Sequence, residues 1–324
     1  MKSAAALNAR QYCPTRIQID HPLNRSSEHG EVTNPTSTRP GFTLTELLVV
    51  IGIIGIMVGL SLPAMQRMRE LSRRSNCEQN LVRLSLALSA YAVDHGHYPT
   101  GTIDESTPIR SVAEGYHHNW IASLLPNLGE TSASTAINRE LSVYDSTNEE
   151  VRRLQLGFLL CPSANNLQKN TTCYAGIHAS SEVPITAEND GMFKLNTSVT
   201  ESEIRDGLGH TIFLAEKLSR PEEELGWISG TRSSLRNVGH GINGERKRVQ
   251  EPRDSEIAIA DTYVGGVLSD HPGGAYLLLG SGEYQFRSNS MDQQLLQQMA
   301  AIADGEIASK GGDGEPLNAT KSSD

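Results

Sequence analysis

One uninterrupted apolar run organises the sequence. From Leu47 to Gln66 there is no charged residue, and a helix of that length, rising about 1.5 Å per residue, spans the roughly 30 Å hydrocarbon core of a bilayer. The segment before the run, residues 1–41, is polar and carries more basic than acidic side chains. Because basic flanks stay on the cytoplasmic side, the pattern predicts a cytoplasmic leader (1–41), a transmembrane helix (42–64) and an exported remainder.

After Pro63 the apolar spacing changes but remains helical. The apolar positions recur at helical spacings of three, four, seven or ten residues, at Met65, Met68 and Leu71 and then at Leu81, Leu84, Leu88 and Tyr91. This is the pattern of one buried face of an amphipathic helix, and a glycine and a proline within residues 94–99 supply stop signals. The sequence therefore predicts a second helical segment over 65–99 that continues the first and packs on a head domain.

Residues 100–303 predict an exported globular head of the α+β class. Short strand-like runs separated by Gly, Pro, Asn and Asp favour an antiparallel sheet, and they lie at 157–160, 192–195, 211–215 and 257–260. The clearest hairpin joins 275–279 to 283–286 through Gly-Ser-Gly. Thr200 with Glu203, and Ser290 with Gln293, fit capping boxes that open short helices. Residues 304–324, rich in Gly, Ser, Asp and Lys, predict a disordered tail.

Composition and charge exclude several functions. The formal net charge is -10 and the pI is near 5.5, so nucleic acid is not expected as a partner, because a basic surplus is needed to displace counterions from phosphates. The sequence holds no Gly-x-Ser-x-Gly elbow, phosphate loop or zinc-protease motif. We therefore expect neither an enzyme nor a cofactor.

The four cysteines and the paired histidines do not form a recognisable metal motif. Cys13, Cys77, Cys161 and Cys173 lack paired CxxC spacing, and His95-x-His97 and His117-His118 have no matching cysteine or acidic pair. No metal site is expected. Because both residues would face an oxidising compartment, a Cys161–Cys173 disulfide is one hypothesis, and two buried thiols are the other.

The boundary between the leader and the apolar run has its own signature. An ordinary signal peptide would be cut after the apolar run, but the residues before Ala64 fit that cleavage rule poorly. The sequence Gly41-Phe42, with Glu46 and Pro63 beyond it, resembles the type IV prepilin and type II secretion pseudopilin signature. The resemblance implies cleavage after Gly41 by a prepilin peptidase, N-methylation of Phe42, and a function of Glu46 in assembly. The alternative is a signal anchor with an incidental Gly-Phe.

Two further features of the sequence bear on assembly and on the head. Gly55 and Gly59 either let transmembrane helices approach closely or are merely tolerated in lipid. Segments from residue 41 to 303 resemble the domain of unknown function 1559 (DUF1559), prepilin-like proteins whose C-terminal motif is His, nine residues, Asp-Gly. They are Cys77–Leu81, Leu86–Tyr91, Leu160–Ser163, Tyr174–Gly176, Glu203–Gly207, Thr211–Glu216 and Ser269–Gly274.

The C-terminal motif of that family is only partly present. His271, Gly273, Gly274 and Gly282 occupy it, but Ser281 replaces the aspartate. The histidine motif is interpreted either as a ligand or catalytic element or, more simply, as a hydrogen-bonded histidine beneath a hairpin whose glycines satisfy backbone angles.

These observations predict a structural subunit. We expect it to be anchored in the inner membrane by a single pass with its head exported, and to assemble with other pilin-like subunits into a filament or pseudopilus. The alternative is a permanently anchored exported binding protein or enzyme that uses the same signal.

Overall fold

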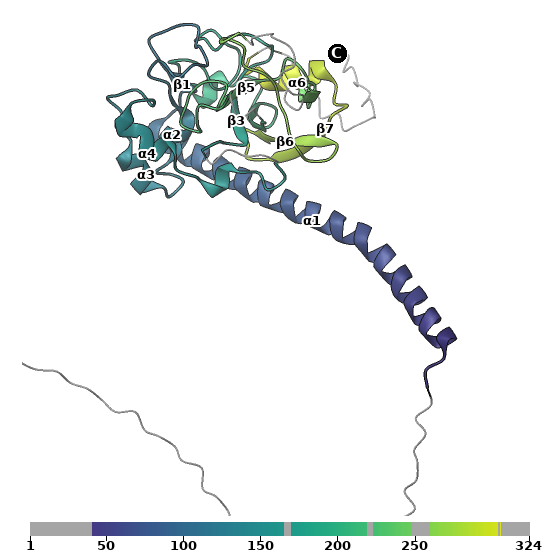
Figure 1. Cartoon of the computed structure of the whole chain (residues 1–324). Helices are drawn as coiled ribbons and strands as arrows, with labels where there is room; N and C mark the ends of the chain where they lie inside the picture. The colour runs from purple at the N-terminus through teal and green to yellow at the C-terminus, as the bar shows by residue number, and fades with distance from the viewer. Residues whose placement is uncertain (1–40, 165–169, 219–222, 248–259, 304, 306–324) are drawn as a thin grey trace, which may run out of the picture. The chain divides into compact units, whose positions relative to one another are not determined.

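Helix α1 contains both the apolar run and the amphipathic segment that follows it. The computed structural model describes residues 41–164, 170–218, 223–247, 260–303 and 305, and α1 spans Leu44–His95 within them (Figure 1). The predicted continuous helix is thus confirmed. The chain divides into two units, residues 1–57 and 58–324, which are described separately. The predicted leader up to residue 40, most of the predicted strand at 257–260 and most of the predicted tail lie outside the described residues.

In the first unit the side chains of α1 are not covered by the described part of the chain. From Gly41 to Met57 every described residue is exposed. An 18-residue stretch of α1 reaches a mean hydropathy of 2.5, and none of that stretch is buried inside the chain. By length and composition α1 can therefore span a membrane.

The second unit contains the rest of α1 and an α+β head. Its short helices are α2 (Trp120–Leu124), α3 (Thr131–Ala136), α4 (Glu149–Arg152) and α6 (Gln293–Ala300), with 3-10 turns η1 (Ser146–Asn148), η2 (Gly157–Leu159) and η3 (Glu201–Glu203). Its strands are β1 (Thr102–Ile103), β2 (His118–Asn119), β3 (Tyr174–Ala179), β4 (Ile212–Glu216), β5 (Leu235–Asn237), β6 (Gly274–Leu279) and β7 (Tyr284–Ser288).

A five-stranded sheet forms the centre of the head. Its strand order is β5-β3-β4-β6-β7, and the pairs β3–β4, β4–β6 and β6–β7 are antiparallel. The predicted α+β class and the β6–β7 hairpin are confirmed. Only the edge pair β3–β5 is parallel.

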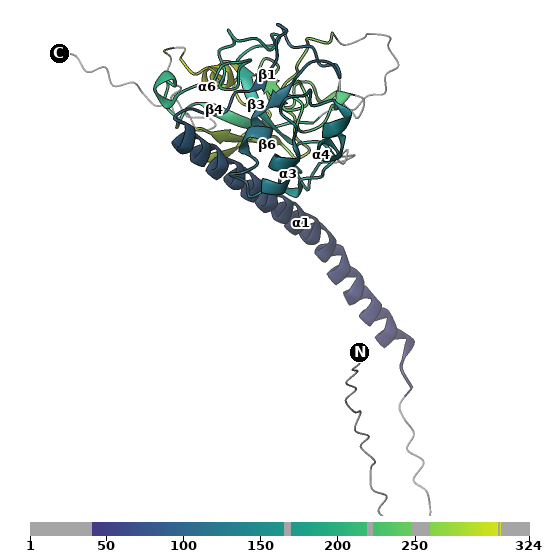
Figure 2. The same ribbon diagram turned by 90° about the vertical axis from the view of Figure 1, so that its left-hand side faces the viewer.

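Both faces of this sheet are buried, each by a different helix. Figure 2 shows the later part of α1 running along the head beneath the sheet. The face toward α1 forms one cluster with it, which includes Leu81, Leu84 and Leu88 of α1 and Tyr174, Leu214 and Leu278 of the sheet. The opposite face packs against α6, in a cluster that includes Leu296, Met299, Ile177, Ala215 and Leu277. Of the face that the helical spacing predicted, Leu81, Leu84 and Leu88 are buried and Tyr91 is half-buried. The same prediction was wrong for Met65, Met68 and Leu71, which are more than half exposed because they precede the part of α1 that packs on the head.

Several local predictions were wrong. The run 157–160 is the turn η2, closed by a hydrogen bond from Leu160 N to Gly157 O, and the run 192–195 contributes only an isolated bridge to the edge of β1. The capping box of Thr200 and Glu203 is confirmed at η3. At α6, however, Asp292 caps the helix in place of the predicted Ser290 by accepting a hydrogen bond from the Leu295 backbone N–H.

Shortening a buried leucine of α1 should destabilise the head, whereas shortening its exposed neighbour should not. Leu84 is fully buried and Leu86 is 66% exposed. Leu84→Ala should lower the free energy of unfolding by about 2–5 kcal/mol, because it leaves a cavity between helix and sheet. Leu86→Ala should change it by less than about 0.5 kcal/mol. Urea unfolding of both variants beside the wild type in detergent measures the difference, and equal losses would contradict this packing.

Acidification should destabilise the head through His178 of β3. Burial lowers the pKa of His178 from its usual 6.5 to about 4, although a hydrogen bond with Asn189 opposes the shift. The unfolded chain therefore binds the proton first, and stability is lost as the pH falls from 6.5 toward 4. Between pH 7 and pH 5 this loss should be about 2 kcal/mol. His178→Gln should remove that part of the pH dependence, and identical pH profiles of variant and wild type would contradict the assignment.

Candidate functional site

The predicted processing motif lies directly before α1. Gly41 and Phe42 precede the helix, and the Phe42 side chain is 77% exposed. At the first turn, Glu46 Oε2 accepts hydrogen bonds from the Thr43 backbone N–H (2.9 Å) and Thr43 Oγ1 (2.8 Å), and Glu46 N donates to Thr43 Oγ1 (3.3 Å). This reciprocal pair is a capping box. Its Thr-x-x-Glu spacing is visible in the sequence, although the resemblance pointed only to assembly.

The glycines of the apolar run are not required by the fold of the single chain. A Cβ atom added at Gly55 or Gly59 would meet nothing within 4 Å. Close packing against another helix therefore remains a prediction for these two positions.

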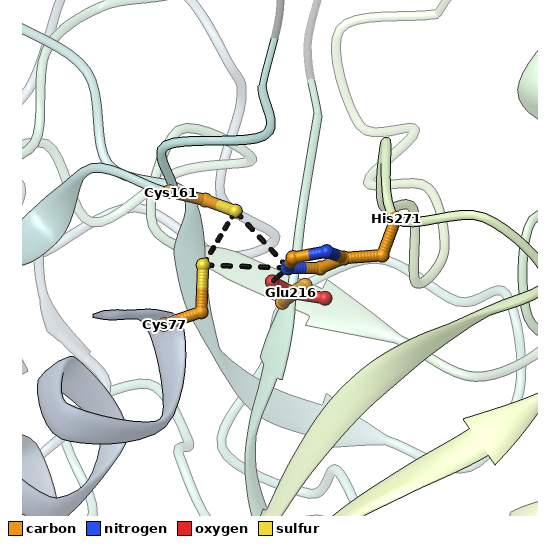
Figure 3. Close-up of side chains that lie close together, drawn as sticks. All are labelled: Cys77, Cys161, Glu216 and His271. Atoms are coloured by element: carbon orange, nitrogen blue, oxygen red, sulfur yellow. Dashed lines mark hydrogen bonds and ion pairs between the residues drawn. The ribbon is translucent and has the colours of Figure 1, made fainter. Parts of the chain in front are cut away.

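A second candidate site is a cluster of four buried side chains in the head unit. Figure 3 shows Cys77 of α1, Cys161 after η2, Glu216 at the end of β4 and His271 in the loop before β6, all pointing toward one another. One potential ligand atom from each residue lies within 4.8 Å of the other three. The four residues are at most 4% exposed.

The imidazole of His271 lies at the centre of the cluster. Its Nε2 is 3.3 Å from Cys77 Sγ, 3.4 Å from Cys161 Sγ and 3.3 Å from Glu216 Oε1. The two sulfur atoms are 2.7 Å apart (Figure 3). Four polarisable or charged atoms thus converge in an interior from which water is largely excluded.

The outer atoms of the cluster are held by hydrogen bonds. His271 Nδ1 lies 2.7 Å from Glu70 Oε1 on α1, and Glu70 in turn forms ion pairs with Arg73 and Arg74. Glu216 Oε2 accepts a hydrogen bond of 2.9 Å from the Tyr276 backbone N–H. These contacts fix the orientation of the imidazole and of the Glu216 carboxylate.

The cluster shifts the pKa of its own members. Burial alone lowers the pKa of His271, but hydrogen bonds with Cys161, Glu216 and Glu70 raise it to about 10. The hydrogen bond with Cys77, followed by burial, raises the pKa of the Cys161 thiol. Chemically, two thiols, an imidazole and a carboxylate can bind a borderline metal ion, and two adjacent thiols can also form a disulfide.

The expected Cys161–Cys173 disulfide is not formed. The three cysteines of the described residues, Cys77, Cys161 and Cys173, are free, and the Cys161 sulfur lies against Cys77. The Cys173 backbone N–H donates to Leu159 O at the entry to β3, and its thiol is buried. The prediction paired neighbours along the sequence, whereas packing of α1 on the head brings the more distant Cys77 to Cys161.

The glycines of the His271 motif shape the backbone of the hairpin. Gly273 and Gly282 have φ angles of +87° and +88°, in the left-handed region that favours glycine. A Cβ atom at Gly274 would lie 2.0 Å from Arg287 O of the paired strand. The glycines therefore have the structural function that was the simpler of the two interpretations, while His271 itself points into the cluster.

The cluster was missed in the sequence because its members are far apart along the chain. Cys77 and Cys161 alone are separated by 84 positions, so no local spacing reveals the group. The adjacent histidines His117 and His118 lie outside the cluster and have other contacts. His117 Nδ1 lies 2.8 Å from Tyr144 OH, and His118 Nε2 lies 2.8 Å from Leu141 O. A usable signal was present, since all four cluster residues fall within segments that carry the DUF1559 resemblance.

Comparison with protein families divides the chain in the same way as its hydrophobic pattern. Residues 66–294 match the family described as "Protein of unknown function (DUF1559)". Residues 37–62 match the prokaryotic N-terminal methylation motif. The second match contains Gly41, Phe42 and Glu46, and the first contains the whole buried cluster.

Curated relatives match a limited part of the chain. The chain is 31% identical over 96 residues to the type II secretion system core protein G of Escherichia coli (strain K12), covering 28% of this chain and 66% of the relative. It is 35% identical over 66 residues to the competence protein ComGC of Halalkalibacterium halodurans, covering 20% of this chain and 65% of that relative.

A third relative is more distant. The chain is 27% identical over 101 residues to the fimbrial protein of Neisseria meningitidis serogroup A, covering 31% of this chain and 59% of the relative. The chain thus spans less than two thirds of the length of these three relatives. No solved structure matches it.

Proposed function

Because the chain belongs to the DUF1559 family of proteins of unknown function and also carries a prokaryotic N-terminal methylation motif, we propose that it is a membrane-anchored, prepilin-like structural subunit. A prepilin peptidase cleaves it after Gly41 and methylates Phe42. The mature chain then assembles with other pilin-like subunits into a filament or a secretion pseudopilus.

The observation that carries this proposal is the placement of the motif. Gly41 and Phe42 lie directly before a helix whose first turns expose only apolar side chains apart from Thr45 and Glu46. The curated relatives include a core protein of the type II secretion system, a competence protein and a fimbrial protein. These names describe components of secretion, competence and fimbrial systems, which favours a structural function over an enzymatic one.

The proposal includes a topology. Residues 1–41 form the cytoplasmic leader, 42–64 cross the inner membrane, 65–99 continue the helix into the head, and 100–303 form the exported head, followed by the tail 304–324. The basic leader supports this orientation through the positive-inside rule.

Cleavage would give the Glu46 carboxylate a new partner. The amine of Phe42 becomes positively charged next to Thr43, whose backbone N–H and hydroxyl already contact that carboxylate. In an apolar environment each charge alone is costly, and pairing offsets part of the desolvation cost. The amine of the same chain or of a neighbouring chain thus competes with the cap for Glu46.

The mature protein should begin at Phe42. The native chain isolated from membranes should have the mass of residues 42–324 plus one methyl group, because peptidase cleavage and N-methylation both act at this residue. Intact-mass spectrometry with N-terminal sequencing measures this. A native N-terminus at Met1, or one after Ala64, would contradict the proposal.

Removal of the Glu46 carboxylate should prevent assembly and leave insertion intact. Glu46→Val replaces a costly acid by an apolar residue, so membrane content and cleavage after Gly41 should be preserved or slightly improved. The yield of sheared surface filaments should fall to background.

Thr43→Ala is the matched control for this variant. It removes the two hydroxyl contacts of the cap and keeps the backbone N–H contact and the Glu46 charge, so filaments should still form if Glu46 acts by pairing with the amine. If Thr43→Ala abolishes filaments as completely as Glu46→Val does, the carboxylate acts as a helix cap. If Glu46→Val assembles normally, Glu46 has no function in assembly, and a permanently anchored exported protein becomes the better account.

A further inference from the structure

The buried cluster of Cys77, Cys161, Glu216 and His271 contains a carboxylate oxygen whose close partner is the His271 imidazole. Glu216 is 1% exposed, and its Oε1 accepts no hydrogen bond among the described residues. Its nearest partner is His271 Nε2 at 3.3 Å. A buried carboxylate oxygen that is held by one ion pair and by no well-formed hydrogen bond is costly, so a metal ion at this position would stabilise it further.

One proton on His271 cannot satisfy the three atoms around it. His271 Nδ1 is engaged by Glu70 at 2.7 Å, which leaves Nε2 to face two sulfur atoms and Glu216 Oε1 at nearly equal distances of 3.3 to 3.4 Å. An N–H bond at Nε2 is directed toward a single acceptor. A cation among the four atoms would interact with all of them at once.

The chemical types of the four potential ligands fit zinc. Zinc is bound tetrahedrally by cysteine sulfur, histidine nitrogen and carboxylate oxygen, and sites with four protein ligands are structural. The histidine ligand of such sites donates its other ring N–H to a carboxylate, as the Nδ1 contact with Glu70 allows. We propose that Cys77, Cys161, Glu216 and His271 form a structural zinc site in the head of this protein.

Binding requires only a small local adjustment. Two sulfur atoms that share one zinc at about 2.3 Å are separated by roughly 3.7 Å in tetrahedral geometry, and here they are 2.7 Å apart. A side-chain rotation of Cys161, which lies in a loop after η2, would supply this change. The two thiols and the protonated His271 imidazole, at Nε2, release their protons to solvent as these atoms bind the ion, and His271 Nδ1 keeps its proton toward Glu70.

The proposed site would join parts of the head that are distant in sequence. Cys77 belongs to α1, Glu216 ends the central strand β4, and Cys161 and His271 lie in separate loops. A metal ion would therefore tie the helix to the sheet and fix both loops against it. This inference concerns the head alone and does not depend on the proposed function of the N-terminal motif.

Metal content of the full chain tests the proposal. The protein is purified from membranes in detergent without added chelator, and zinc is measured by elemental analysis and by native mass spectrometry. The wild type should contain one zinc ion per chain. Cys161→Ser and His271→Gln should lose it, whereas Cys173→Ala, which removes the buried thiol outside the cluster, should retain it.

Two further measurements keep the test valid if a cluster variant fails to fold. After removal of the metal, wild-type protein titrated with Co²⁺ should develop the visible bands of tetrahedral cobalt and sulfur-to-cobalt charge-transfer bands. Glu70→Ala, which removes the partner of His271 Nδ1 and leaves all four proposed ligands in place, should weaken zinc binding by about 10- to 100-fold while the thiolate bands persist.

Three results would overturn the proposal. The first is wild-type protein that is free of metal and binds no Co²⁺ although its thiols are reduced. The second is a mass lower by two hydrogens with a Cys77–Cys161 disulfide, which would show that the cluster is a redox pair. The third is zinc retained at full occupancy in both Cys161→Ser and His271→Gln.

Discussion

Among the described residues, the first half of helix α1 packs against no apolar surface, and this constraint governs the rest of the structure. Side chains such as Ile51, Ile56 and Leu60 are more than half exposed. Burying a large aliphatic side chain is worth about 1.5–3 kcal/mol, so a run of this length cannot stay in water. It must be covered by lipid, as in a membrane anchor, or by the same segment of other chains, as in a filament.

The second half of the same helix buries its apolar side chains by packing on the head. Leu81, Leu84 and Leu88 are buried against the sheet, and polar contacts from the same helix reach the head as well. Glu70 contacts His271, and Tyr276 OH donates to Glu78 at 2.7 Å. The proposed metal site would add a coordinate bond from the metal ion to Cys77, at the start of this buried face, and so would link α1 to the other ligands in the head.

The sequence predicted well the structural features that depend on residues close together along the chain. The apolar run, the three- and four-residue spacing of Leu81, Leu84 and Leu88, and the Gly-Ser-Gly turn of the β6–β7 hairpin each depend on near neighbours, and each is confirmed. Strands β3 and β5 were missed because β3 is interrupted by Gly176 and His178, and β5 is short and mostly polar. The parallel β3–β5 pair and the meeting of Cys77 with Cys161 depend on tertiary packing, which local patterns do not encode.

The central claim is that the exposed half of α1 is buried against other copies of the chain, and cysteine cross-linking within that segment tests it most directly. A chain with Gly55→Cys, expressed in cells that contain the assembly machinery, is oxidised in the membrane and separated under non-reducing conditions. The account predicts covalent dimers through position 55 that disappear on reduction. Cys77, Cys161 and Cys173 are buried in the head, so they should not form cross-links between chains. Monomers alone, in cells that assemble filaments normally, would contradict it.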